Sequence, residues 1–219
     1  MKLLLLSLIT VVACTAHAAA QIRVPENDTQ SWNDFQLTVP MSKKVDLVTQ
    51  LTLRFGDNLT KPVDERAGFG FNYKLNKYVT LNELVFMREA RPPNGRRERE
   101  IRLTLGATLQ KTFNKYTLSD RNWFERRWRE PQVDAWRYRN RLRLEHPFQI
   151  SKTKFNWFVS DEVFYDWSLN DWVRNRAAIG ANHAFNKHFT LELYYMRQND
   201  GRSRPGDLHI IGSLWRFKL

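Results

Sequence analysis

Four arginines, Arg137, Arg139, Arg141 and Arg143, stand at every second position of one segment, and the residues between them carry no charge. A β-strand directs successive side chains to opposite faces, so this segment, as a strand, has one wholly cationic face. Arginine can bind carboxylates and phosphates through two parallel hydrogen bonds. Such a face can meet water, a nucleic acid or the polar lumen of a membrane barrel, so the surrounding elements decide its function.

The charge of the whole chain points to an anionic partner. The 219 residues include 35 Lys and Arg against 23 Asp and Glu, which gives a formal net charge of +12. Nucleic acid, anionic lipid and acidic sugars all fit such a balance. Aromatic residues make up 13% of the chain, with eight Trp. That share is high for a soluble domain and ordinary for a membrane protein with aromatic residues at both interfaces.

The first twenty residues have the form of a secretory signal peptide. Lys2 supplies the positive start, and residues 3–13 form an apolar run too short to span a membrane. Residues 16–18 and 18–20 are both small-x-small cleavage sites. We therefore expect residues 1–20 to be removed and residues 21–219 to form the mature domain. Secretion argues against a nucleic-acid partner.

The single cysteine, Cys14, allows an alternative N-terminal processing. Residues 11–14 are similar to a bacterial lipobox, in which the cysteine is lipidated and becomes the first residue. In either case no thiol remains for a disulfide or a thiolate metal site. No cluster of His, Asp and Glu has metal-ligand spacing, so we predict neither a metal nor a cofactor.

The sequence also predicts no catalytic site. A barrel hydrolase needs a histidine and a serine on neighbouring lumenal positions, so that the imidazole can take the hydroxyl proton. His209 and Ser213 share one face of a strand, but they are four residues apart and are expected to point outward. We therefore predict that the chain is not an enzyme.

Alternation of apolar and polar residues predicts an all-β chain. It is clearest in residues 99–110, where Ile101, Leu103 and Leu105 face one way and Arg102 and Thr104 the other. The predicted strands are residues 32–39, 45–55, 67–75, 78–88, 99–110, 115–127, 133–146, 155–167, 172–185, 189–198 and 208–219.

The connections between these segments predict an antiparallel, up-and-down transmembrane β-barrel. Short turns alternate with longer loops, as in outer-membrane barrels with their short turns in the periplasm. An antiparallel barrel of this kind closes with an even number of strands. Because residues 21–26 are the candidate for a further strand, we predict twelve strands, with ten as the alternative.

The faces of the strands decide which residues line the lumen. Arginine in the middle of a bilayer costs roughly 2–4 kcal/mol in a barrel, so the apolar faces around Ile101 and Ile179 should point to lipid. Seven arginines then line the lumen and are the candidate anion contacts: Arg102, Arg137, Arg139, Arg141, Arg143, Arg174 and Arg176.

Four polar residues do not fit this assignment. Alternation places Asp120, Asn122, Asn140 and Asp161 on the lipid face, so we expect a bulge there or a position beyond the hydrocarbon. The alternative architecture is a soluble periplasmic barrel with the apolar faces inside and the arginines in water, where they would bind an acidic ligand.

Five short motifs carry a family resemblance. They are residues 138–142, 146–148, 161–165, 175–180 and 194–200, which read YRNRL, HPF, DEVFY, NRAAIG and YYMRQND. In this order they resemble the bacterial outer-membrane barrel family known as domain of unknown function 2490. The resemblance implies the barrel and the outer membrane, and it implies no established activity. A weaker likeness, in the lumenal arginines and the terminal Phe-Lys-Leu, is to small twelve-stranded porins for acidic oligosaccharides.

Two functions for the lumen remain open. Hairpin geometry places Glu162 opposite Arg137 and Arg139 and near Arg176, so Glu162 is the candidate internal ion-pair residue. An Arg–Glu network of this kind would fill a non-conducting structural barrel. Alternatively, the inward arginines exceed the acids Glu162, Asp166 and Glu192, and this excess would favour small anionic solutes in a narrow, anion-selective pore.

The predicted long loops carry further arginines. They cluster at residues 88–99 and 121–129, together with Trp123 and Trp128. Guanidinium groups at the outer surface would meet the phosphates of lipopolysaccharide. The expected partners are therefore outer-membrane lipid and lipopolysaccharide, and the expected location is the bacterial outer membrane.

Overall fold

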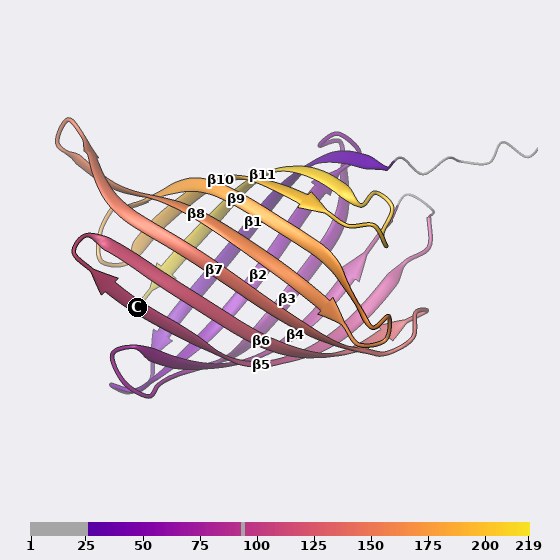
Figure 1. Cartoon of the computed structure of the whole chain (residues 1–219), viewed down its shortest axis with the longest axis horizontal. Helices are drawn as coiled ribbons and strands as arrows, with labels where there is room; N and C mark the ends of the chain where they lie inside the picture. Colours follow the sequence, from indigo (N-terminus) through magenta and orange to yellow (C-terminus); the bar gives the residue numbers. More distant parts are fainter. Residues whose placement is uncertain (1–25, 93–94) are drawn as a thin grey trace, which may run out of the picture.

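The computed structural model describes residues 26–92 and 95–219, which form one closed β-barrel (Figure 1). In these residues no helix is long and apolar enough to cross a membrane. The eleven strands of the described chain are β1 (Asn27–Pro40), β2 (Val45–Gly56), β3 (Lys61–Lys74), β4 (Val79–Ala90), β5 (Glu98–Phe113), β6 (Tyr116–Glu130), β7 (Ala135–Ile150), β8 (Thr153–Asp166), β9 (Asp171–Ala184), β10 (Phe189–Asn199) and β11 (Asp207–Lys218).

The barrel closes with an odd number of strands, so the prediction of twelve or ten is wrong. Each strand pairs antiparallel with the next, but β1 pairs parallel with β11, from Asn27 opposite Asp207 to Thr38 opposite Lys218. A parallel closing pair removes the need for an even count. The predicted signal peptide, Cys14 and most of the proposed extra strand at residues 21–26 lie outside the described residues, and the barrel closes without that strand.

Because the count is odd, β1 and β11 run in the same direction, and the start of β1 and the end of β11 lie at opposite ends of the barrel. We call one end the turn end: it carries the connections after β1, β3, β5, β7 and β9, and also Leu219, where Figure 1 marks the C-terminus. We call the other end the loop end: it carries the remaining connections and the start of β1 at Asn27.

Several strands are longer than the apolar pattern predicts. The predicted loop at residues 56–66 is only a turn at residues 57–60, because Asp64 and Glu65 still pair with β2 and β4. The predicted turn at residues 147–154 likewise contracts to residues 151–152. The backbone hydrogen bonds between strands continue beyond the residues whose side chains alternate between apolar and polar. The alternation in the sequence therefore predicts the apolar middle of each strand and not its ends.

The outer and inner faces of the barrel wall differ in polarity. Ile101, Leu105 and Ile179 are exposed on the outer wall, whereas Arg102 and Arg137 are buried in the lumen. This is the reverse of the soluble alternative, in which apolar residues would fill the interior. Phe124 packs against Tyr138 nearer the loop end, and Tyr116 packs against His146 nearer the turn end.

The polar residues that did not fit do face outward, and they bond to one another. The Asn140 amide donates to Asp120 at 2.5 Å and to Asn122 at 3.0 Å, and Asn175 donates to Asp161 at 2.8 Å. The β6–β7 register runs unbroken through these positions, so the expected bulge is wrong there. Mutual hydrogen bonding satisfies these groups instead.

Glycines let two large side chains lie flat against the inner wall. A Cβ at Gly212 would come 2.0 Å from Cζ of Tyr194, and one at Gly106 would come 2.6 Å from Cδ1 of Trp123. Any side chain at these positions would push the rings out of place. The two glycines therefore help to position aromatic residues of the lumen.

Candidate functional site

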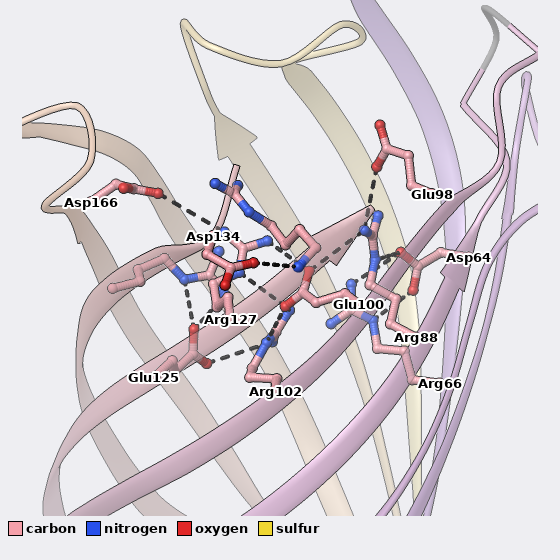
Figure 2. A network of polar contacts seen from close by, with 12 residues as sticks. Asp64, Arg66, Arg88, Glu98, Glu100, Arg102, Glu125, Arg127, Asp134 and Asp166 are labelled. Carbon is pink, nitrogen blue, oxygen red and sulfur yellow. Dashed lines mark hydrogen bonds and ion pairs between the residues drawn. The ribbon is translucent and has the colours of Figure 1, made fainter. Parts of the chain in front are cut away.

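A buried carboxylate anchors the loop-end half of the lumen. The Glu125 side chain on β6 is 0% exposed and accepts hydrogen bonds from Nε of Arg137 at 2.6 Å and from Arg139 at 2.8 Å. Arg102 on β5 lies 3.5 Å from the same carboxylate. A buried carboxylate is stable when guanidinium groups both offset its charge and satisfy its lone pairs. Glu125 meets both conditions (Figure 2).

Two further acids extend this arrangement around the wall. Glu100 accepts hydrogen bonds from Arg102 at 2.7 Å and from Arg127 at 2.9 and 2.8 Å. Asp64 accepts two hydrogen bonds from Arg66, at 2.6 and 3.2 Å, and one from Arg88 at 2.5 Å. Arg88 lies 3.7 Å from Glu100 and so joins the two groups. We call the following residues the loop-end network, of which Figure 2 labels all but the last two: Asp64, Arg66, Arg88, Glu98, Glu100, Arg102, Glu125, Arg127, Arg137 and Arg139.

An apolar cluster occupies the opposite side of the lumen. Trp32 on β1 packs with Leu208 and Ile210 on β11, and all three are buried. Tyr194 and Met196 on β10 pack against them. The loop-end network lies on β3 to β7, so ion pairs on one side and apolar side chains on the other together fill this part of the lumen.

Glu162 on β8 is the register partner of Arg141 on β7. It accepts hydrogen bonds from Arg121 at 2.6 Å and from Arg139 at 2.8 Å, and Arg176 lies 3.7 Å away. Arg137, expected near Glu162, bonds instead to Glu125, its register partner on β6. Sequence reasoning overlooked Glu125 because the inner face of β6 had not been assigned.

A third ion-pair group lies on the turn-end side. Glu192 on β10 accepts two hydrogen bonds from Arg143, at 3.0 and 2.9 Å, and one from Arg216 at 2.8 Å. Arg143 also stacks on Phe158, with Cζ 3.6 Å from the ring centre. Both partners of the Arg143–Glu192 pair are buried.

Arg174 ties the inner wall to the loop between β10 and β11. Its Nε donates to Asp200 at 2.6 Å, and Asp200 also accepts backbone N–H bonds from Arg202 and Ser203. Burial on its own would raise the pKa of Asp200, but the Arg174 guanidinium and the Arg202 N–H outweigh it and lower the pKa.

A cavity of about 360 Å³, which we call the chamber, lies between the loop-end network and the Arg143–Glu192 pair. Among the described residues that line it, nine are arginines and three, Asp34, Glu162 and Glu192, are acids. The excess of arginines raises the local concentration of anions, because charge in a low-dielectric tube is poorly screened.

Unpartnered donors surround the chamber. Nε of Arg54, Arg121, Arg139 and Arg141 is buried, and none of the four has a hydrogen-bond partner in the described part of the chain. Of the seven arginines predicted to line the lumen, Arg141 is the one that forms no ion pair with a described residue. A buried donor without an acceptor costs about 1–3 kcal/mol.

Two tryptophans of the chamber each carry two guanidinium groups. Arg54 lies 3.4 Å and Arg176 4.8 Å from the ring centre of Trp32. Arg121 lies 3.8 Å and Arg139 5.2 Å from that of Trp123. Stacking on an aromatic face holds a guanidinium in place and leaves its edge free to donate hydrogen bonds.

Sequence reasoning missed much of this site. Glu100, Glu125 and Arg121 were not assigned to the lumen, and Arg54, although on the polar face of its predicted strand, was not among the candidate anion contacts. A signal for β6 was present, because Arg121, Trp123, Glu125 and Arg127 alternate as the arginines of β7 do. The inner face of β6 was overlooked because its outer face, with Asp120 and Asn122, is not apolar.

The residues considered for a metal site or a hydrolase site lie as follows. Residues 26–92 and 95–219 hold no group of three His, Cys, Asp or Glu side chains that could bind a metal ion. His209 faces outward and shares a 2.7 Å hydrogen bond with the hydroxyl of Tyr195, whereas Ser213 bonds to Asn33 and Trp215.

The fold and the site define a class: a closed β-barrel with an apolar outer wall and an ion-paired, arginine-rich interior. The chain belongs to the family described as "Protein of unknown function (DUF2490)", whose model matches residues 29–208. No curated protein sequence matches the chain.

Three solved structures are similar in outline. LpxR from Salmonella typhimurium is 8% identical, with 80% of this chain and 83% of that chain covered and a TM-score of 0.49. The anion-selective porin from Comamonas acidovorans is 13% identical, with 80% of this chain and 54% of that chain covered and a TM-score of 0.41. The siderophore receptor PirA from Pseudomonas aeruginosa is 11% identical, with 75% of this chain and 32% of that chain covered and a TM-score of 0.32. At these values the likeness extends to neither ligand nor activity.

Proposed function

We propose that the chain is an outer-membrane β-barrel that takes small anions into the chamber and does not pass them freely. The observation that carries this proposal is the set of buried, unpartnered Nε–H donors on Arg54, Arg121, Arg139 and Arg141. An anion in the chamber would supply the acceptors that the protein lacks. The apolar outer wall and its aromatic residues support the membrane location.

Because several inner-wall side chains are partly exposed toward the turn end, we infer that anions reach the chamber from that end. Lys74, Glu145 and Arg216, toward that end, have side chains 42%, 30% and 34% exposed. Toward the loop end, the fully buried Glu125 and its guanidinium partners fill the lumen. With the turns in the periplasm, anions would enter from the periplasm and stop at the loop-end network.

Conductance in planar bilayers tests the closed lumen. Wild-type protein should show no steady current in potassium chloride. Glu125→Gln removes the charge that holds Arg102, Arg137 and Arg139 together, so it should produce anion-selective openings. Glu65→Gln is the matched control, because Glu65 pairs with Arg91 on the outer wall. A cation-selective current through the wild-type protein would contradict the proposal. Recovery of the wild-type protein in the soluble periplasmic fraction would also contradict it.

A second candidate function is the narrow anion-selective pore. The excess of arginines in the chamber favours it. A steady, anion-selective wild-type current would support this pore over the closed chamber. If wild type conducts nothing and also binds no anion, the barrel is a structural one filled by its Arg–Glu network.

We also propose that the loop end contacts lipopolysaccharide. Arg97 and Arg99 are exposed there and share Glu89, at 3.5 and 3.9 Å. Exposed ion pairs of this kind are weak, so lipid phosphates can compete for the guanidinium groups. Reduced retention of an Arg97→Gln, Arg99→Gln variant on immobilised lipopolysaccharide would support this contact, and unchanged retention would exclude it.

A further inference from the structure

The two tryptophan–arginine groups of the chamber lie on opposite walls. We call Trp32, with Arg54 and Arg176, the Trp32 clamp, and Trp123, with Arg121 and Arg139, the Trp123 clamp. Trp32 is on β1 and Trp123 on β6, and around the barrel β2 to β5 separate them on one side and β7 to β11 on the other. Both tryptophans line the chamber, and Glu162 lies between the two clamps, bonded to Arg121 and Arg139 and 3.7 Å from Arg176.

Each clamp has donors that the protein does not use. In the Trp32 clamp, Nε of Arg54 is unpartnered, and no described carboxylate forms an ion pair with Arg54. In the Trp123 clamp, Glu162 accepts from terminal nitrogens of Arg121 and Arg139, while Nε of both remains unpartnered.

Arg141 adds a further donor beside the Trp123 clamp. It is the register partner of Arg121 across β6 and β7, it lines the chamber, and its buried Nε is also unpartnered. An acceptor is therefore lacking for Arg54 in the Trp32 clamp and for Arg121, Arg139 and Arg141 at the Trp123 clamp. A ligand with two acid groups could supply one acceptor to Arg54 and a second to the donors at the Trp123 clamp.

From this geometry, and resting on the proposed function, we propose that the chamber binds a small organic anion with two acid groups, one held at each clamp. The cavity of about 360 Å³ is at the small end of ligand pockets, which fits a small molecule rather than a polymer. Carboxylate and phosphate groups both match the fork geometry of arginine. The aromatic faces of Trp32 and Trp123 would flank the part of the ligand between its acid groups.

Isothermal titration of the full chain in detergent, at constant ionic strength, tests this proposal. The probes are succinate, acetate and inorganic phosphate. Succinate should bind about tenfold or more tightly than acetate, because its second contact is intramolecular. Arg54→Gln and Arg141→Gln should each weaken succinate binding by about tenfold, toward the affinity of acetate.

The matched control is Arg126→Gln. Arg126 also lies near two tryptophans, Trp128 and Trp136, and pairs with Asp134, but it is on the outer wall. This variant should bind succinate as the wild type does. Heat-modifiable migration on gels and circular dichroism show whether each variant is folded, and quenching of tryptophan fluorescence by succinate gives a second readout.

The outcomes separate this inference from the proposed function. If succinate and acetate bind equally and Arg141→Gln weakens both, the chamber holds single acid groups, so the inference is overturned and the proposed function stands. If phosphate binds as tightly as succinate, a compact anion at one clamp suffices and the inference is again overturned. If folded wild-type protein binds none of the probes, both proposals fall.

Discussion

Arg143 on β7 donates two hydrogen bonds to Glu192 on β10, at 3.0 and 2.9 Å, although β8 and β9 separate these strands in the wall. The two side chains therefore meet inside the lumen. Together with Arg216, which donates to the same carboxylate at 2.8 Å, they bound the chamber on its turn-end side. The chamber thus lies between two groups of ion pairs.

Breaking this pair should destabilise the barrel strongly. In Glu192→Gln, Arg143 and Arg216 lose their shared carboxylate, and the loss of one partner of a buried pair typically costs about 3–5 kcal/mol. The double variant Arg143→Met, Glu192→Leu leaves Arg216 and Glu145 without these partners, but both side chains are about one-third exposed and can be hydrated, so it should lose less stability. Urea unfolding of both proteins in lipid vesicles measures the difference. A single variant milder than the double one would show that the pair contributes little.

The loop between β10 and β11 should loosen in acid. The folded pKa of Asp200 is lowered by Arg174 and by the Arg202 N–H, so this contact stabilises the loop fully above the unfolded pKa of about 4. Its contribution is lost as the pH falls through the lower, folded pKa. Hydrogen exchange of the Arg202 and Ser203 amides, corrected for intrinsic rates, should accelerate only in that acidic range.

In Asp200→Asn, these two amides should already exchange quickly at neutral pH and should show no further acid transition. If an acid transition persisted in Asp200→Asn, a group other than Asp200 would be responsible for it.

An exposed carboxylate on the outer wall tests the membrane location. Glu83 on β4 lies between Phe71 on β3 and Leu105 on β5, and it is exposed. If this wall faces lipid, Glu83→Leu should raise the free energy of unfolding in a bilayer by about 1 kcal/mol. Glu65→Leu, which breaks an ion pair with Arg91, is the control and should bring no gain. Equal stability of Glu83→Leu and wild type would argue against a lipid-facing position.

Because the number of strands is odd, the start of β1 and the end of β11 should lie on opposite sides of a membrane. A short epitope inserted before Asn27 should be labelled on one side, and one added after Leu219 on the other. With the turns in the periplasm, antibody should reach the first in intact cells and the second only after permeabilisation. Labelling of both epitopes from the same side would contradict the parallel β1–β11 closure.

Alternation in the sequence predicts the barrel and its inner arginines because a strand has a strict two-residue period. It does not predict register or the strands that face each other across the lumen. Glu162 was therefore expected near Arg137, which instead bonds to Glu125 on the other neighbouring strand. The Arg143–Glu192 pair joins residues 49 positions apart on strands that are not neighbours, so local sequence could not reveal it.

The same limits explain the errors in the fold. An even number of strands was predicted because a barrel closed by antiparallel pairs requires one. Nothing in the side chains of β1 or β11 indicates that these two strands pair in parallel. The outward Asn140 and Asp120 break the apolar pattern, and their mutual hydrogen bond depends on the β6–β7 register. Sequence periodicity thus predicts which residues share a face of each strand. The pairing of the strands determines which polar side chains become hydrogen-bond or ion-pair partners.

The central claim is that the lumen holds an anion between the loop-end network and the Arg143–Glu192 pair. Anomalous scattering from crystals soaked in bromide tests it most directly, because bromide marks anion sites by position. Our account predicts a peak in the chamber within hydrogen-bonding distance of Arg141 or Arg54, and loss of the Arg141 peak in Arg141→Gln. Bromide only on the outer surface, with an empty chamber, would contradict it.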